Sequence, residues 1–402
     1  MTSSMSRRVT GAAIAVVGFV YLIYVWDRMV VGIELVEIRK EFGLSLADGG
    51  LLASVFTLGI TLAAIPAGLV IMRAGTRLTL VLGAVLFSLA TVWTALAPGL
   101  SGMIASRIAG GVGEALYNVA LFTFLGRLTE TRRGAAAGLP ATLFGTGLFL
   151  GPLVISGLLA GLGTWRGPFL ILAGAGLAGA AAIWLLLGRL AADTAPEERV
   201  PITWARVRRV LSGRNLLLCI VVAVNGIAMY SFIALYETFL RSDLNWSLAT
   251  ASLVVSVNGA GQLIGGLPMG YLADRIGRKA YLLLAALLAG AAGLALFRAT
   301  SFAGCAGIAF AFGLAANSIY TNAIALIQDE VARSDIPLAT GLLATVYFFT
   351  AAFSGYLLAT VRNAWGWGPA GAIVYTIPFA VVAAIMLGLL LRPPAVRRPA
   401  MP

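Results

Sequence analysis

The ten residues Gly270-Tyr-Leu-Ala-Asp-Arg-Ile-Gly-Arg-Lys279 form a short charged stretch between two long apolar runs. A related stretch, Gly68-Leu-Val-Ile-Met-Arg-Ala-Gly-Thr-Arg77, lies 202 residues earlier and also separates two apolar runs. Glu34 and Glu237 recur at nearly the same spacing. Internal repetition over so long a distance predicts a chain built from two homologous halves.

The composition is that of a membrane protein. Hydrophobic residues make up 60% of the chain and charged residues 11%, and the mean hydropathy is +0.96. Each apolar run is long enough to cross a hydrocarbon core of ~30 Å, which takes ~20 helical residues. The predicted spans lie near residues 11–33, 49–71, 78–97, 101–126, 135–160, 168–189, 215–240, 249–273, 280–297, 301–327, 337–361 and 367–391. The sequence therefore predicts an all-α membrane protein of twelve transmembrane helices in two pseudo-symmetric six-helix halves.

One long polar segment divides the chain into these halves. We expect a six-helix bundle over residues 1–189, a cytoplasmic linker over 190–214, and a second six-helix bundle over 215–402. Within the linker, Trp204–Arg209 has the pattern of a short amphipathic helix that would lie on the membrane surface.

The net charge of +12 follows from topology and does not indicate a nucleic-acid partner. Twenty Lys and Arg residues fall in the loops predicted on one side of the membrane and six in those on the other. The positive-inside rule then places both termini in the cytoplasm. We expect the protein to lie in the inner membrane of the cell.

Four charged residues lie deep within the predicted spans: Asp27 and Arg28 on the first, and Arg107 and Glu114 on the fourth. A charge at the bilayer centre costs at least ~2.5–3.5 kcal/mol, so such residues usually face a cavity or a partner. At ~1.5 Å per residue, Asp27 and Arg107 lie at similar depth, which predicts an ion pair between them and leaves Arg28 for a substrate anion. Glu114 lies near the midplane with no cation adjacent in sequence, which favours it as a proton carrier. The alternative is a buried network that only holds the two spans together.

Further polar side chains on the spans are candidates for substrate binding or for hydrogen bonds between helices. They are Tyr117 and Asn118 on the fourth span, Asn225 and Tyr230 on the seventh, and Asn317 and Tyr320 on the tenth. Glu34 and Glu237 lie at the outer ends of the first and seventh spans. We expect solvated residues at the mouth of the protein there, and the alternative is that they are coupling acids.

The stretch Gly270–Lys279 resembles the Gly-x-Leu-x-Asp-Arg-x-Gly-Arg-Lys pattern of the major facilitator superfamily, and the resemblance covers essentially the whole chain. It implies a conformational latch made by Gly270, Asp274, Arg275, Gly277 and Arg278, whose ion pairs hold the inward-closed state. The first-half copy departs from the pattern, because Met72 stands where the family has aspartate.

A narrower resemblance lies in Tyr24-Val-Trp-Asp27-Arg28 and in Arg107-Ile-Ala-Gly-Gly-Val-Gly-Glu114-Ala-Leu-Tyr117. These stretches are similar to anion:cation symporters, which include sialin and bacterial sugar-acid permeases, and to spinster-like transporters. The resemblance implies that Asp27 and Glu114 couple protons and that Arg28 and Arg107 bind the anion and pair charges.

We therefore expect a secondary active transporter that carries a small organic anion, a monocarboxylate or sugar acid, by proton-coupled symport and alternating access. Its partners would be that anion, protons and membrane lipids, and it would work as a monomer without a cofactor or metal. The alternative is an exporter of lipids, amphiphiles or drugs, of spinster-like or efflux type.

An enzyme is not expected, because the chain contains no histidine for Ser–His or His–metal chemistry. Cys219 and Cys305 are too few and too far apart in sequence for a metal site, and we interpret them as packing residues. Of the aspartates, only Asp27 lies inside a predicted span, whereas an intramembrane aspartic protease needs a pair. A receptor that has lost transport is a further alternative.

Overall fold

The computed structural model describes residues 2–128, 133–187, 204–211, 213–332 and 335–391, and all of the regular structure in these ranges is helical. The first half contains α1 (Thr2–Ile33), α2 (Leu35–Phe42), α3 (Leu46–Ser54), α4 (Phe56–Leu96), α5 (Leu100–Leu128), α6 (Arg133–Leu162) and α7 (Arg166–Leu187). After α8 (Trp204–Val210), the second half contains α9 (Arg214–Ser242), α10 (Leu248–Gly265), α11 (Leu267–Ile276), α12 (Arg278–Ala295), α13 (Phe302–Glu330), α14 (Ile336–Ala351), α15 (Ser354–Trp365), α16 (Trp367–Gly371), the π-helical turn η2 (Ala372–Thr376) and α17 (Ile377–Leu391).

Twelve helical segments among the described residues are long and apolar enough to cross a membrane, which confirms the predicted number. The eighth span ends at Gly265, earlier than hydropathy alone predicts, because the helix breaks at Gly266.

Both copies of the repeated ten-residue stretch make the same turn. Gly75 interrupts α4 with φ 78° and ψ 162°, and Gly277 separates α11 from α12 with φ 91° and ψ 127°. Backbone of positive φ is open to glycine and strained for other residues. The shared turn is the structural counterpart of the sequence repeat, and it reverses the chain between the second and third spans of each half.

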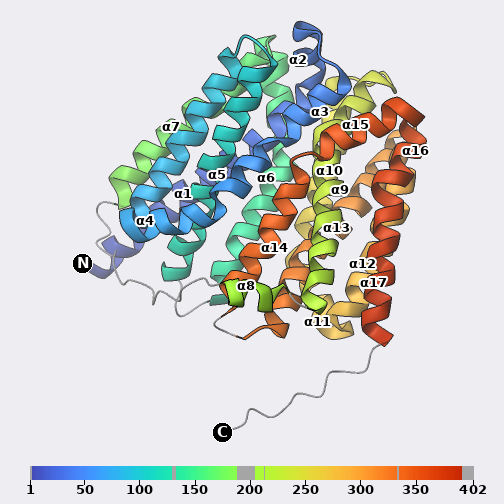
Figure 1. The fold of residues 1–402 in the computed structure, drawn as a ribbon. Coiled ribbons are helices and arrows are strands. Elements are labelled where there is room, and N and C mark those ends of the chain that lie inside the picture. The colour runs from blue at the N-terminus through green and yellow to red at the C-terminus, as the bar shows by residue number, and fades with distance from the viewer. Residues whose placement is uncertain (1, 129–132, 188–203, 212, 333–334, 392–402) are drawn as a thin grey trace.

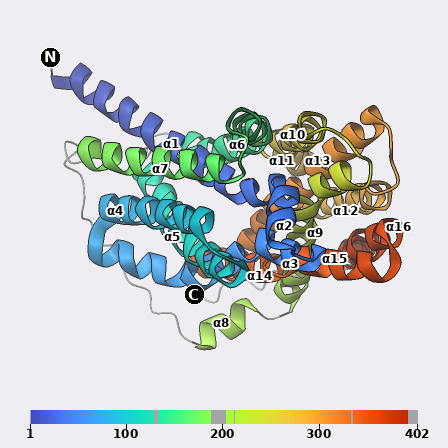
Figure 2. The same ribbon diagram turned by 90° about the horizontal axis from the view of Figure 1, so that it is seen from above.

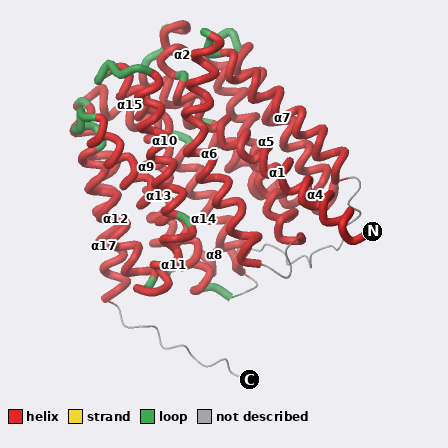
Figure 3. The backbone as a smooth tube through the Cα atoms, turned by 180° about the vertical axis from the view of Figure 1, so that it is seen from behind, coloured by secondary structure: helices red, strands yellow, loops and turns green. Residues whose placement is uncertain are grey.

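The two halves lie side by side, and the long helices of both run between the same two ends of the molecule. In Figure 1, α1–α7 occupy one side of the molecule and α9–α17 the other, and Figure 2 shows the same division from above. We call the end that carries α2, α3 and α15 the α2 end, and the opposite end, with α8 and α11, the α8 end (Figure 3).

The halves touch backbone to backbone at the α2 end. A Cβ added to Gly50 on α3 would lie 2.3 Å from the carbonyl oxygen of Gly355 on α15, and one added to Gly355 would lie 2.1 Å from that of Gly50. The Ser54 hydroxyl donates to the Ala352 carbonyl oxygen across the same contact (2.9 Å). Towards the middle of the molecule, α6 meets α10, where a Cβ on Gly259 would lie 2.4 Å from the Leu148 carbonyl.

The predicted linker falls partly outside the described residues, because 188–203 and 212 are not described. The amphipathic stretch does form the short helix α8, on which Trp204 is 87% exposed. Arg206 on α8 pairs with Asp335 at the start of α14 (2.6 Å), so α8 is attached to the second half.

The closest packing inside the first half joins α4 to α5, and it depends on glycine. A Cβ on Gly111 would lie 1.9 Å from the Phe56 carbonyl oxygen, whereas one on Gly157 of α6 would meet no atom within 4 Å.

We expect Gly111→Ala to lower stability by about 1–3 kcal/mol through overpacking. Gly157→Ala is the matched control, since both substitutions bring the same gain in helix propensity. Thermal unfolding of the purified protein in detergent checks this; equal melting temperatures for the two variants would contradict it.

Candidate functional site

The predicted ion pair between the first and fourth spans is present. Arg107 Nη1 on α5 lies 2.8 Å from Asp27 Oδ2 on α1, and its Nη2 donates to the Asp27 carbonyl oxygen at 3.1 Å. Both side chains are 1% exposed. The Thr91 hydroxyl on α4 donates to the other carboxylate oxygen of Asp27 (2.7 Å). Asp27 is thus held by two neighbouring helices of its own half.

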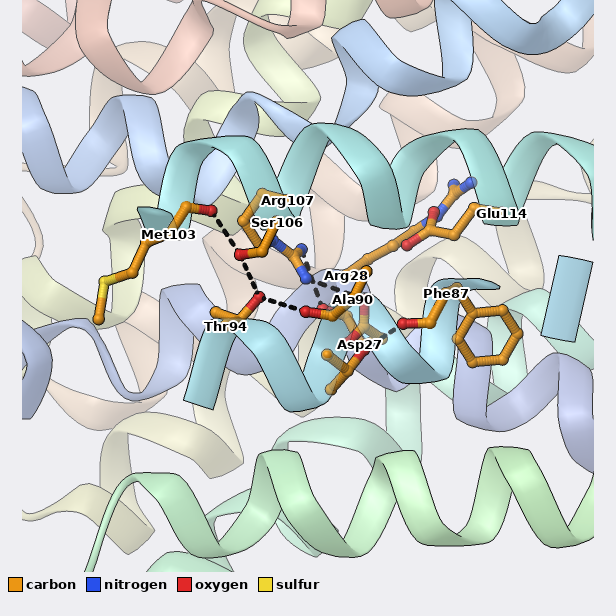
Figure 4. Close-up of polar contacts among 10 residues, drawn as sticks. Asp27, Arg28, Phe87, Ala90, Thr94, Met103, Ser106, Arg107 and Glu114 are labelled. Carbon is orange, nitrogen blue, oxygen red and sulfur yellow. Dashed lines mark hydrogen bonds and ion pairs between the residues drawn. The ribbon is translucent and has the colours of Figure 1, made fainter. Parts of the chain in front are cut away.

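Near this pair, two hydroxyl groups join α4 to α5 (Figure 4). The Thr94 and Ser106 hydroxyl oxygens are 2.8 Å apart. Thr94 donates to the Ala90 carbonyl, and Ser106 to the Met103 carbonyl. These bonds satisfy buried polar groups between two helices of one half.

Arg28 forms the second buried ion pair. Its Nε lies 2.8 Å from Glu114 Oε2, and the Glu114 side chain is fully buried while that of Arg28 is 5% exposed. Figure 4 shows Glu114 two turns along α5 from Arg107. The sequence has no cation adjacent to Glu114 along the chain, and the prediction left Arg28 to bind a substrate. In the structure, Arg28 and Glu114 instead form an ion pair with one another. The second oxygen of Glu114, Oε1, has no hydrogen-bond partner among the described residues.

The guanidinium of Arg28 lies among aromatic rings from both halves. From the first half, it lies 4.2 Å from the Tyr24 ring centroid and 5.7 Å from that of Phe56. From the second half, Phe348 on α14 lies 5.6 Å away, and the Tyr230 hydroxyl on α9 accepts from Nη1 at 3.2 Å. Arg28 also donates to the Tyr24 hydroxyl. Arg28 is therefore a buried charged side chain that contacts both halves, whereas Arg107 belongs to the interior of one half.

Tyr230 continues into an aromatic series within the second half. Its ring centroid lies 5.9 Å from that of Tyr347, which lies 4.4 Å from that of Tyr320. Two predicted substrate residues, Tyr230 and Tyr320, thus belong to one cluster that reaches Arg28. Tyr347 connects them.

The other predicted substrate residues are engaged in bonds between helices or lie apart from Arg28. Tyr117 donates to the Val17 carbonyl (2.7 Å), Asn225 to the Ala316 carbonyl (3.0 Å) and Asn317 to the Gln262 carbonyl (2.7 Å). The Asn118 Oδ1 atom is buried with no hydrogen-bond partner among the described residues. A role of these four in substrate binding stays a prediction.

The predicted latch lies at the α8 end, where α11, α12 and α13 meet. Arg278 pairs with Asp274 (2.9 Å) and approaches Asp329 on α13 at 3.4 Å, while Lys279 lies 3.9 Å from Glu330. Arg275 donates to Tyr271 (2.6 Å), and Gly277 supplies the turn described above. All of these partners belong to the second half, so in this conformation the contacts brace three helices of one half.

Two residues expected to be solvated are buried. Glu34 is 0% exposed and Glu237 is 2% exposed, both at the α2 end. The prediction is wrong because the halves close over these positions, a contact that hydropathy and charge do not reveal.

Several residues of the site carried no signal that sequence reasoning could use. Phe56, Phe348 and Thr91 are ordinary residues of apolar spans, and only their distance from Arg28 or Asp27 marks them. Within the described ranges, no cluster of three or more Cys, Asp or Glu side chains is arranged to hold a metal ion.

Among the described residues, twelve segments that can span a membrane, two repeated halves and a buried ion pair where those halves meet are typical of helical membrane transporters. A model of the Major Facilitator Superfamily matches residues 17–224 and 218–401, and the chain belongs to this family. The chain is accordingly a multi-pass helical membrane protein of this family.

Curated relatives share parts of the chain. A probable L-galactonate transporter of Escherichia coli is 25% identical over 285 residues, covering 66% of this chain and 62% of the relative. The hexuronate transporter of Bacillus subtilis is 24% identical over 273 residues, covering 63% and 62%. A probable chloroplastic anion transporter of Oryza sativa is 30% identical over 205 residues, covering 49% and 33%. The matched region thus spans less than two thirds of these relatives.

Solved structures share the fold. A bacterial homologue of the human lysosomal transporter Spinster, inward-facing and unoccupied, superposes with a TM-score of 0.74 at 17% identity, covering 95% of both chains. A mutant of the nucleoside transporter NupG gives a TM-score of 0.78 at 13% identity, covering 94% of this chain and 98% of that one.

The Asp27–Arg107 pair can be tested as a structural element. We expect Asp27→Asn to destabilise the protein by about 3–5 kcal/mol, because it leaves the Arg107 charge buried without a counter-charge. Glu41→Gln removes the carboxylate of a more exposed pair, Glu41–Arg166, and should have little effect. Thermal unfolding in detergent compares the two; an Asp27→Asn melting temperature equal to that of Glu41→Gln would contradict the assignment.

Proposed function

We propose that this protein is a proton-coupled symporter for a small organic anion, a sugar acid or monocarboxylate, which works by alternating access. The observation that carries the proposal is the position of Arg28. Its guanidinium is buried, contacts both halves and is neutralised by one carboxylate, that of Glu114. A planar guanidinium binds carboxylates in a two-pronged geometry that no other cationic side chain offers.

The Arg28–Glu114 pair supplies a route to coupling. A substrate carboxylate that binds Arg28 takes the place of Glu114, and the displaced Glu114 carboxylate would then be buried without a counter-charge. Burial of an unpaired charge costs several kcal/mol, so Glu114 takes up a proton instead. Anion binding and proton binding thereby favour each other, as symport requires.

Asp27 has a different place in this scheme. Its carboxylate accepts hydrogen bonds from Arg107 and Thr91 and so is held within the first half. We therefore assign Glu114 as the principal proton carrier, with Asp27 as the second coupling acid. Arg107 would orient Asp27. Arg107 would contact the substrate only after the Asp27–Arg107 ion pair has separated.

The names of the relatives support this substrate class. The matched proteins are named for L-galactonate, hexuronate and other anions. The aromatic series Tyr230, Tyr347 and Tyr320 gives the second half rings and hydroxyl groups that suit a polyhydroxylated acid. We place the α8 end in the cytoplasm, with both termini, and propose that the protein acts as a monomer in the cell membrane.

Substrate and coupling are tested together on the purified protein. A thermal-shift screen against galactonate, glucuronate and lactate identifies the anion, and proteoliposome uptake measures its transport. Wild type should accumulate the anion uphill on an inward proton gradient. Glu114→Gln should bind and exchange the anion without uphill accumulation, because the amide cannot take up and release a proton. Glu41→Gln serves as a control that keeps full accumulation; uphill accumulation by Glu114→Gln would refute its role.

The anion site is tested by Arg28→Lys. Lysine keeps the charge but loses the fork, so we expect the affinity for the anion to fall about 10–100-fold, the value of one or two charge-assisted hydrogen bonds. Arg166→Lys, at the exposed pair with Glu41, is the matched control and should bind normally. Titration calorimetry provides the measurement. An unchanged affinity for the anion in Arg28→Lys would favour the amphiphile exporter. The same conclusion would follow if the protein bound lipids but no anion.

A further inference from the structure

A second group of buried carboxylates lies at the α2 end. Glu34, in the link between α1 and α2, is 0% exposed, and Glu237 on α9 is 2% exposed. They occupy corresponding positions of the repeat and come from opposite halves. The charged groups that face them are Glu37 on α2 and Arg241 on α9, and Ser252 on α10 donates to Glu237 Oε1 (2.8 Å).

This group lies in the contact between the halves. A Cβ added to Gly32 on α1 would lie 2.3 Å from the carbonyl oxygen of Ile233 on α9. Arg241 donates to the Ile33 carbonyl oxygen (3.0 Å) and pairs with Glu37 across the same contact. Separation of the halves at the α2 end would therefore expose Glu34 and Glu237 to water.

The charges at this contact do not balance. Among the described residues, the three carboxyl groups of Glu34, Glu37 and Glu237 face one guanidinium, that of Arg241, and Glu37 already pairs with it. Both Glu34 oxygens and the Glu237 Oε2 atom are buried with no hydrogen-bond partner among the described residues. A carboxylate in such surroundings takes a proton and becomes neutral. Burial raises the pKa of Glu34 to about 10, with Glu37 and Glu237 adding to the rise and Arg241 opposing it.

We propose that Glu34 and Glu237 form a second proton-binding site, and that the halves close at the α2 end only when both carboxyl groups carry protons. The ligand is the proton, taken from solution on the α2 side as the halves close and returned there as they open. Glu34 is seven residues beyond Asp27, or ~10 Å along the helix axis. The site is distinct from the Arg28–Glu114 pair and does not depend on the identity of the substrate.

The direction of the pH effect follows from linkage. In the open form both carboxyl groups face water, where an ordinary glutamate has a pKa near ~4.3, whereas the contact of the closed form excludes two unpaired carboxylate charges. Raising the pH above that value therefore favours opening. The ratio of closed to open molecules falls by up to about tenfold per pH unit for each proton released, and below about pH 4 the dependence disappears.

Distances between spin labels at the α2 end measure this equilibrium directly. Thr164, between α6 and α7, and Ala364 on α15 are exposed and belong to opposite halves. We would label Thr164→Cys and Ala364→Cys in a chain also carrying Cys219→Ala and Cys305→Ala, and record distances from about pH 5 to about pH 9. Wild type should pass from a short to a long distance as the pH rises. Glu34→Gln with Glu237→Gln should keep the short distance throughout, since the amide imitates a protonated carboxyl.

The single substitutions keep the test decisive if the double variant does not fold. Glu34→Gln or Glu237→Gln alone should reduce the steepness of the transition from about two protons to about one. A purely structural role would shift the midpoint and leave the steepness unchanged. Wild-type steepness in both single variants, or a wild-type transition in the double variant, would overturn the proposal.

Two controls separate this site from its surroundings and from the transport site. Glu41→Gln removes a carboxylate at the same end, whose pKa is lowered to about 2 by hydrogen bonds from Arg166 and Trp165, so its transition should match wild type. Glu114→Gln should also retain the transition, whatever its effect on uptake. Loss of the transition in Glu114→Gln with its persistence in the double variant would assign the pH response to the Arg28–Glu114 pair and refute the second site.

Discussion

A charge buried inside a membrane protein must be paired, and the structure depends on two such pairs. Asp27–Arg107 ties α1 to α5 within the first half, with Thr91 of α4 completing the carboxylate. The Arg28–Glu114 pair also joins α1 to α5, but it lies at the contact with the second half, where Arg28 meets Tyr230 and Phe348. Adjacent residues of one helix thus have opposite tasks. Asp27 faces inward and fixes a bundle, whereas Arg28 faces the partner half and can exchange its carboxylate for another.

Close backbone contact gives the halves their second constraint. Glycine meets glycine or a carbonyl oxygen at Gly50–Gly355 and at Gly32–Ile233, both at the α2 end. Contacts of this kind leave no room for water, so any polar side chain beside them loses its hydration when they form. Glu34 and Glu237 lie beside them. The desolvation free energy of these carboxyl groups therefore contributes to the free energy of closing the α2 end. In this way the packing of the halves is coupled to protonation.

The spans, the two halves and the Asp27–Arg107 pair were predictable, because each follows from a regular quantity: the length of apolar runs, the repeat distance, and the rise of a helix per residue. The Arg28–Glu114 pair was not predictable in this way. Residue counts place the two positions at different depths in the membrane, but the long arginine side chain reaches across that difference. The burial of Glu34 and Glu237 was also missed, because it arises only when distant segments of the chain meet. Phe56 and Phe348 are marked as site residues only by their distance from one guanidinium.

The Gly50–Gly355 contact has a practical consequence for studying the other states of the cycle. One methyl group on either residue would lie closer to the opposing carbonyl oxygen than atoms can approach, without altering any charge or any group near Arg28. A chain with alanine at one of these positions is therefore a rational starting point for imaging the conformation open at the α2 end. It would also give ligand screens access to a surface that the closed form hides.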